Sequence, residues 1–159
     1  SCAVLSGEES EDELIALGDD IATYFGKGCR NVTKLFVPVG YSFQKLLDLL
    51  SDHYGDLVNH SKFSNNYDYY KSIYLVNQTP HYDTGFMLFV ENESFGAPIS
   101  TVYFEYYDDL STVDKKLTEE AEQIQCVVGK GRIDFGLAQK PEISDFADGV
   151  DTMQFLVSL

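Results

Sequence analysis

The chain has 159 residues, 44% of them hydrophobic and 14% aromatic, and this composition predicts one globular domain rather than a disordered segment. Its formal net charge of −15 would repel DNA, RNA and anionic membranes, so we expect no nucleic-acid partner. No apolar run approaches the length of a membrane span, and we expect no segment that crosses a bilayer.

Three helices are expected from hydrophobic periodicity and end signals. The first begins after Ser10, which forms a capping box with Glu13, and it ends at the glycines around Gly26. The second follows Ser42, and the third begins near Thr112.

Strands are expected between these helices. The expected strands cover residues 1–5, 32–39, 72–76, 85–90, 99–106, 125–128 and 153–157. Residues 54–71 are rich in tyrosine and asparagine without a clear period, and we expect a loop or an irregular hairpin there. Strands that alternate with helices predict an α/β fold arranged as a three-layer sandwich.

The three cysteines lie far apart in the chain, without a Cys-x-x-Cys pair. An odd number of cysteines and the lack of a secretory leader predict a reducing, cytoplasmic location. Cys2 and Cys126 stand in apolar runs, so we expect them in the core. The histidines lack the spacing of metal ligands, and we expect surface or capping positions and no metal site, with a zinc site as the alternative. The histidines are His53, His60 and His81.

Cys29 stands in a turn, where a helical pattern stops and a β-branched run begins. A thiol reacts as a nucleophile when nearby positive charge favours the thiolate and the backbone leaves it exposed. The segment KGCRNVTK holds Lys27, Arg30 and Lys34 and no acidic residue. A flanking glycine lets a substrate approach, and a backbone N–H of the turn could stabilise an oxyanion. These residues suit a nucleophilic cysteine and equally a buried structural cysteine beside a helix end.

The order of these elements resembles the catalytic half of the aldehyde dehydrogenase superfamily. There a strand and an acidic helix lead to a glycine-cysteine turn with the nucleophile, here GKGCRN, and then to another strand. The segment ESFGAP (residues 93–98) resembles the E-x-F-G-P loop of that family, with Ala97 inserted. The turn FGKGCRNVTKLFVP and the tail QCVVGKGRIDFGLAQKPEISDFADGVDTMQFL are similar to those of the fatty acyl-CoA reductases of the bioluminescence type.

The resemblance implies a role for five residues. Cys29 would attack an acyl-CoA and hold the acyl group as a thioester, which NADPH would reduce to an aldehyde. Glu93 and Phe95 would bind the cofactor, with Glu93 on the nicotinamide ribose. Arg30 and Asn31 would bind the substrate, an acyl-CoA or a fatty aldehyde.

The resemblance also implies that residues 1–159 are one catalytic domain from a larger protein. The family's cofactor-binding domain, its general base and the asparagine of its oxyanion hole precede this segment, so we expect NADPH to be bound mainly by a domain outside this chain. A homo-oligomer is compatible with the resemblance. Two alternatives stay open: a fragment of a CoA-independent aldehyde dehydrogenase, and a non-catalytic acidic interaction domain.

Overall fold

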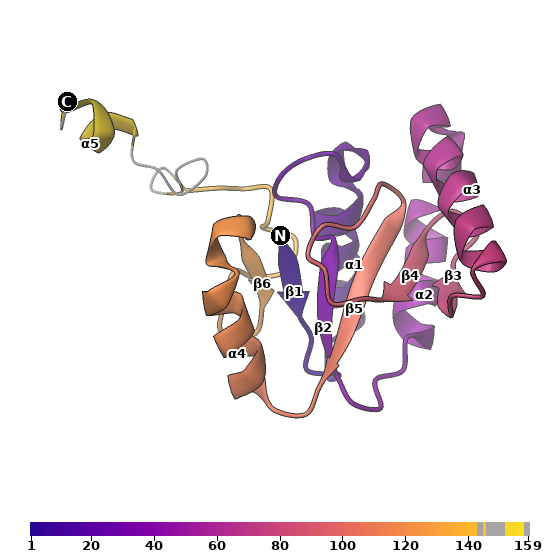
Figure 1. The fold of residues 1–159 in the computed structure, drawn as a ribbon, viewed down its shortest axis with the longest axis horizontal. Helices are drawn as coiled ribbons and strands as arrows, with labels where there is room; N and C mark the ends of the chain where they lie inside the picture. The colour runs from indigo at the N-terminus through magenta and orange to yellow at the C-terminus, as the bar shows by residue number, and fades with distance from the viewer. Residues whose placement is uncertain (143–144, 146–151, 158–159) are drawn as a thin grey trace.

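One mixed sheet organises the computed structural model of the protein, which describes residues 1–142, 145 and 152–157. The described strands are β1 (Cys2–Val4), β2 (Lys34–Pro38), β3 (His81–Asp83), β4 (Leu88–Glu91), β5 (Thr101–Tyr107) and β6 (Val127–Gly129). Their order is β3-β4-β5-β2-β1-β6 (Figure 1). Only β3 is antiparallel to its neighbour, so β4, β5, β2, β1 and β6 end at the same edge of the sheet.

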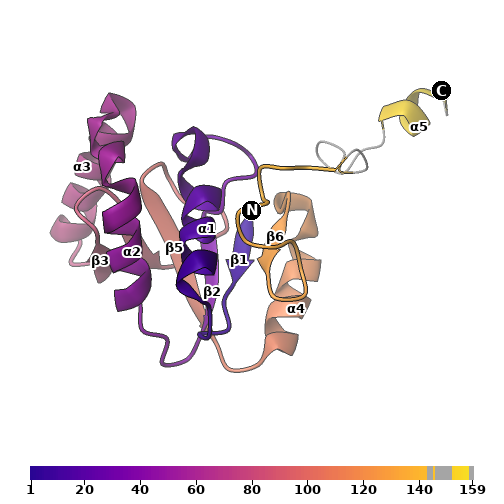
Figure 2. The same ribbon diagram turned by 180° about the vertical axis from the view of Figure 1, so that it is seen from behind.

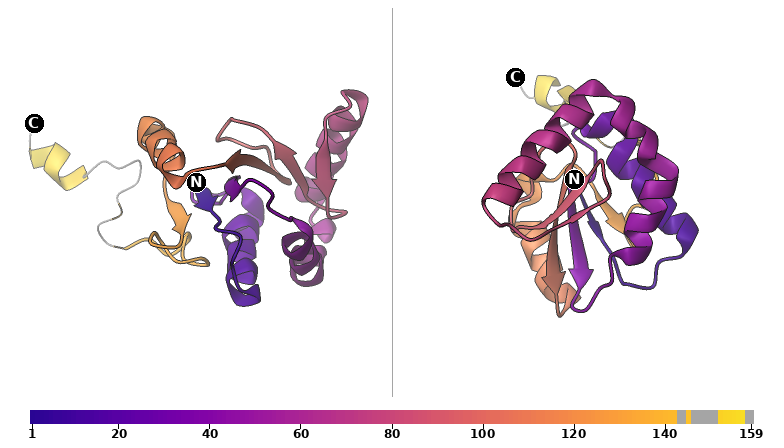
Figure 3. Two further views of the ribbon diagram at one scale, coloured as in Figure 1. Left: turned by 90° about the horizontal axis from the view of Figure 1, so that it is seen from below. Right: turned by 90° about the vertical axis from the view of Figure 1, so that its right-hand side faces the viewer.

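Helices cover both faces of this sheet. The described helices are α1 (Glu11–Ala22), α2 (Gln44–Tyr54), α3 (Ser61–Val76), α4 (Leu110–Glu119) and α5 (Thr152–Val157), with short 3₁₀ helices η1 (Thr23–Gly26), η2 (Gly55–Asn59) and η3 (Ala121–Gln123). α1 and α2 pack on one face and α4 on the other, while α3 lies at the β3–β4 end (Figures 2 and 3). The predicted three-layer α/β sandwich is confirmed. Among the described helices, none is both long and apolar enough to cross a bilayer.

The side chains of β2 show how the two apolar layers form. Leu35 and Val37 join the cluster under α1 and α2. Phe36 points to the opposite face and packs with Val113 and Leu117 of α4. Because successive side chains of a strand alternate between faces, one run of apolar residues supplies both layers. Cys2 and Cys126 are buried, as the sequence predicts.

Helix α1 begins as predicted and ends earlier than predicted. The Ser10 hydroxyl accepts from the backbone N–H of Glu13 at 3.2 Å, and the Glu13 carboxylate accepts from the N–H of Ser10 at 2.8 Å. At the other end, Tyr24 and Phe25 have φ angles of 55° and 59°. These left-handed residues turn the chain out of the helix before it reaches Gly26.

Three predictions of secondary structure are wrong. The expected loop over residues 54–71 and strand over 72–76 contain the end of α2, η2 and the whole of α3. α3 has a weak periodic signal because only Phe63 and Tyr67 of its residues are fully buried. The expected strand over residues 153–157 is helical, as part of α5. Periodicity cannot separate a short apolar run in a helix from one in a strand.

Candidate functional site

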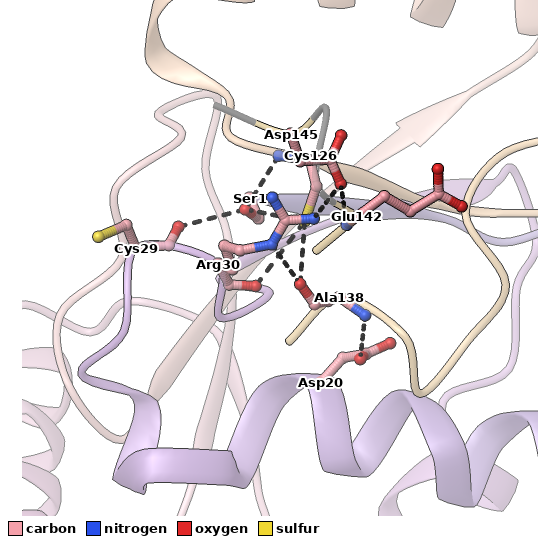
Figure 4. A network of polar contacts seen from close by, with 8 residues as sticks. All are labelled: Ser1, Asp20, Cys29, Arg30, Cys126, Ala138, Glu142 and Asp145. Carbon is pink, nitrogen blue, oxygen red and sulfur yellow. Dashed lines mark hydrogen bonds and ion pairs between the residues drawn. The ribbon is translucent and has the colours of Figure 1, made fainter. Parts of the chain in front are cut away.

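Cys29 lies on a tight turn at the edge of the sheet where the parallel strands begin. The backbone N–H of Asn31 donates to the carbonyl oxygen of Gly28 at 3.0 Å, so Cys29 and Arg30 occupy the centre of a β-turn that leads into β2. Cys29 is exposed, and the alternative of a buried structural cysteine is therefore wrong. Figure 4 shows its thiol pointing away from the polar network behind the turn.

The side chain of Asn31 fastens this turn to the end of α1. Its Oδ1 accepts from the N–H of Gly28 at 2.7 Å, and its Nδ2 donates to the carbonyl oxygens of Asp20, Ile21 and Thr23 at 3.1, 3.0 and 2.7 Å. Asn31 is 1% exposed. The last carbonyl groups of a helix lack partners within it, and this amide supplies partners for them. The structure thus gives Asn31 a positioning role, and its contact with a substrate stays a prediction.

Arg30 joins the turn to the segment that follows β6. Its Nε donates to the carbonyl oxygen of Ala138, and its guanidinium lies 3.6 Å from the carboxylate of Asp145 (Figure 4). The Arg30 side chain is 17% exposed. A guanidinium engaged in this way fixes the turn against Ala138 and Asp145, and its contact with a substrate also stays a prediction.

Asp20 is a buried carboxylate that the sequence analysis missed. It is 1% exposed, and its two oxygens accept from the N–H groups of Gly136 and Ala138 at 2.7 and 2.9 Å. Burial raises the pKa of Asp20, although these two hydrogen bonds oppose the shift. Its position among the apolar residues of α1, three residues after Leu17, was the signal available in the sequence. Asp20 holds the segment after β6 beside the Cys29 turn.

Ser1 links the turn to the start of β6. Its hydroxyl donates to the carbonyl oxygen of Cys29 at 3.2 Å and accepts from the N–H of Cys126 at 3.2 Å. The Cys29 turn is therefore tied to α1 by Asn31, to the segment after β6 by Arg30, and to β6 by Ser1.

The three cations near Cys29 in the sequence do not gather around its thiol. Lys27 lies over the ring of Phe25 at 5.5 Å, and Arg30 faces Ala138 and Asp145. Lys34 is fully buried on β2, and its ammonium forms an ion pair with Glu105, which is far from it in the sequence. The turn and the strand send these neighbouring side chains in different directions, so their closeness in the sequence does not give a positive patch around the thiol.

The ESFGAP loop does come close to the segment between the Cys29 turn and β2. The Thr33 hydroxyl donates to the carbonyl oxygen of Phe95 at 3.0 Å. The ring of Phe95 packs on Phe36 with centroids 6.0 Å apart, on the α4 face of the sheet. Two predicted site segments, 64 residues apart at Cys29 and Glu93, are thus joined through Thr33 and Phe95.

An ion-pair network around the buried side chain of Lys34 lies beside this loop. Lys34 contacts Glu105 at 2.9 Å, and Lys116 donates to both oxygens of that carboxylate at 2.8 and 2.7 Å. Burial lowers the pKa of Lys34, and the bond to Glu105 opposes the shift. Burial alone would raise the pKa of Glu105, but hydrogen bonds from Lys116 and Lys34 outweigh it and hold the pKa below its usual range.

Glu93 is exposed and lines a pocket of about 410 Å³. The residues that line this pocket are Thr79, Pro80, Glu91, Asn92, Glu93 and Glu105. Carboxylates accept hydrogen bonds from sugar hydroxyls, so the lining suits a ribose. It offers no cation for a pyrophosphate. The residues fit one part of NADPH and not its phosphates.

A second pocket, of about 370 Å³, lies at the opposite edge, where β1, β5 and β6 end. Its lining residues are Val4, Leu5, Ser6, Tyr107, Leu110, Asp114, Lys130, Gly131 and Arg132. Ligands of open α/β sheets usually bind at this edge. Cys29 lies at the other one.

Among the described residues, no three histidine, cysteine or acidic side chains gather as metal ligands. His60 instead caps α3, because its Nδ1 accepts from the N–H of Phe63 at 3.3 Å. That capping position is one of the two predicted for the histidines. In comparisons with known proteins, no family model matches the chain. No curated protein matches it either.

Proposed function

We propose that the chain is the catalytic domain of an NADPH-dependent acyl-CoA reductase and that Cys29 carries the acyl group. The observation that supports this most is the exposed thiol at the centre of a turn that is fastened from three sides. The resemblance of the turn, the ESFGAP loop and the tail to the fatty acyl-CoA reductases supports the choice of substrate.

In the acylation step, the thioester of acyl-CoA is exchanged for a thioester on Cys29. The Cys29 thiolate attacks the carbonyl carbon, a bond forms from that carbon to the Cys29 sulfur, and the bond to the CoA sulfur breaks. CoA leaves as a thiolate that takes up a proton. When bound, NADPH would supply a hydride to the acyl carbon. The oxyanion left on that carbon would then re-form the carbonyl as the bond to the Cys29 sulfur breaks, which releases the aldehyde and a Cys29 thiolate that can react again or take up a proton.

The neighbouring residues would position these reactants. The backbone N–H groups of Cys29 and Arg30 make no hydrogen bond with a described residue, so they are available to a developing oxyanion. Glu93 would accept hydrogen bonds from the nicotinamide ribose, and Phe95 would form the wall between this ribose and the turn. Arg30 and Asn31 would contact the substrate through the backbone of the turn that they hold.

Acyl transfer to Cys29 is tested by labelling. The full-length protein that contains this chain is incubated with radiolabelled octanoyl-CoA, and the acyl-enzyme is located by mass spectrometry. We expect Cys29→Ala to abolish the label and Cys126→Ala to keep it, since Cys126 is buried in the core. Label retained in the Cys29→Ala variant would overturn the proposal.

The same protein separates the two alternatives. A CoA-independent aldehyde dehydrogenase would form NADPH from a fatty aldehyde and NADP⁺ without CoA and would not be labelled by octanoyl-CoA. A non-catalytic interaction domain would show neither reaction.

A further inference from the structure

One polar atom beside the Cys29 turn lacks a hydrogen-bond partner. The side-chain Nε2 of Gln139 is buried, and no described residue accepts a hydrogen bond from it. The amide of Gln139 faces Gly28, the first residue of the turn: a Cβ on Gly28 would lie 3.7 Å from both its Nε2 and its Oε1. The large majority of buried donors in proteins are paired, and an exception beside the first residue of the Cys29 turn requires a reason.

The backbone that carries this amide is fixed. The preceding residue, Ala138, donates its N–H to Asp20 and accepts from Arg30, so both of its backbone groups are engaged. The side chain of Gln139 itself is only partly buried. Its last torsion has a broad, roughly twofold profile, so the amide can turn at little cost while its Cα stays in place. Gln139 therefore combines a fixed origin with a donor that gains a bond when a ligand arrives.

From this placement we infer that the Gln139 amide donates a hydrogen bond to the carbonyl oxygen of the acyl group that Cys29 receives. The inference rests on the proposed function. As the thiolate attacks, the carbonyl oxygen gains negative charge and becomes a stronger acceptor, so a donor without a previous partner stabilises this step more than the unreacted enzyme.

The test compares Gln139→Ala with the wild-type full-length protein in three measurements. The first is the single-turnover rate of Cys29 acylation by octanoyl-CoA, the second is the rate of Cys29 alkylation by iodoacetamide, and the third is the melting temperature. We expect acylation to slow by roughly 10- to 100-fold. Alkylation should stay unchanged, because displacement at a methylene carbon creates no oxyanion. The melting temperature should not fall, because the Nε2 of Gln139 has no hydrogen-bond partner among the described residues to lose.

Gln123→Ala is the matched control. Its Nε2 donates to the carboxylate of Glu120 on the surface, far from the turn in the sequence, and we expect normal rates in all respects. Normal acylation in Gln139→Ala would overturn the inference and leave the proposed function intact. Equal slowing of acylation and alkylation with a lower melting temperature would also overturn it, since that pattern describes a structural residue. An absence of acylation in the wild-type protein would instead overturn the proposed function, and the inference with it.

Discussion

At the scale of single residues, the geometry of the turn depends on the Asn31 amide more than on Cys29 itself. Asparagine suits this position because its Nδ2 group has two hydrogens that three carbonyl oxygens share, while its Oδ1 accepts from one N–H. An aspartate of the same shape would accept from Gly28 and leave the three carbonyl oxygens of Asp20, Ile21 and Thr23 facing a carboxylate. The hydrogen bonds of the turn therefore require an amide side chain at position 31.

Asp20 gives a prediction for the pH dependence of stability. Burial raises its pKa in the folded protein above the ordinary value of 3.8, so the folded state binds this proton more tightly than the unfolded chain. The contribution of Asp20 to the free energy of unfolding is therefore largest at low pH. It decreases as the pH rises from about 3.8, the ordinary pKa, through the raised pKa of the folded protein. Compared with Asp20→Asn in urea titrations at several pH values, the wild-type protein should lose relative stability as the pH rises.

Asp109→Asn is the control of opposite sign. Hydrogen bonds from the hydroxyl and N–H of Ser111 lower the pKa of Asp109. Its stabilising effect is present above the ordinary pKa and is lost as the pH falls, so here the wild-type protein should gain relative stability as the pH rises. The assignment of Asp20 as a carboxylate destabilised by burial would be contradicted if the wild-type protein became more stable relative to Asp20→Asn as the pH rises.

At the scale of elements, the end of α1 stores backbone strain four residues before the thiol. Tyr24 and Phe25 are both in the left-handed region, which costs L-residues about 1–2 kcal/mol each. At Phe25 this strain is offset by the ring, which stacks on His60 with centroids 3.8 Å apart. Tyr24 is 66% exposed. Such strain is typical of positions that a functional segment requires.

Tyr24→Gly should therefore stabilise the protein by up to about 1 kcal/mol, the relief of strain less the entropy that glycine loses on folding. Tyr24→Ala is the control: it removes the same ring and keeps a Cβ at a φ of 55°, so it should bring no gain. The measurement is the free energy of unfolding of the three proteins in urea. Equal stability of the glycine and alanine variants would show that the backbone at Tyr24 is unstrained.

The elements that the sequence predicted are those with a strong local signal. The capping box of Ser10 located the start of α1, and the alternating residues of β5 located the strand at the centre of the sheet. α3 could not be found in this way, because tertiary contacts hold it: the hydroxyl of Ser100 donates to the carbonyl oxygen of Phe63, and Lys71 pairs with Asp83. β3 is three polar or aromatic residues at the sheet edge, with no pattern long enough to recognise.

The same limit applies to the site. The turn at Cys29 follows from glycine and the break in the helical pattern, and both are visible in the sequence. The partners of the turn are not, because Asp20 and Arg30 both contact Ala138 only when β6 has joined β1 and brought the following segment across α1. The direction of the Lys34 side chain is hidden for a similar reason: its face of β2 is set by the pleat and not by its distance from Cys29 in the sequence.

At the scale of the whole molecule, the two edges of the sheet carry different features: a pocket at one edge and the Cys29 turn at the other. The pocket of about 370 Å³ lies where β1, β5 and β6 end, while Cys29, Thr33 and Phe95 lie where the strands begin. The pocket beside Glu93 has an acidic lining, and the chain as a whole carries a net charge of −15. Neither feature attracts the phosphates of NADPH or of CoA. If Cys29 reacts as proposed, we expect these phosphates to be held outside the acidic pocket beside Glu93.

This arrangement leads to a prediction for the 159-residue chain on its own. We expect it to fold, because both faces of the sheet are covered and the core clusters are complete within it. Its Cys29 should be alkylated by iodoacetamide, since the thiol is exposed. It should not oxidise NADPH in the presence of octanoyl-CoA, because an accessible nucleophile does not by itself position a hydride donor.

The measurements are circular dichroism, mass spectrometry of the alkylated protein and the loss of NADPH absorbance, with the full-length protein as the control that turns over. NADPH oxidation by the isolated chain that disappears in Cys29→Ala would place the phosphate-binding groups within these 159 residues, and the positively charged pocket residues Lys130 and Arg132 would then be the first to substitute.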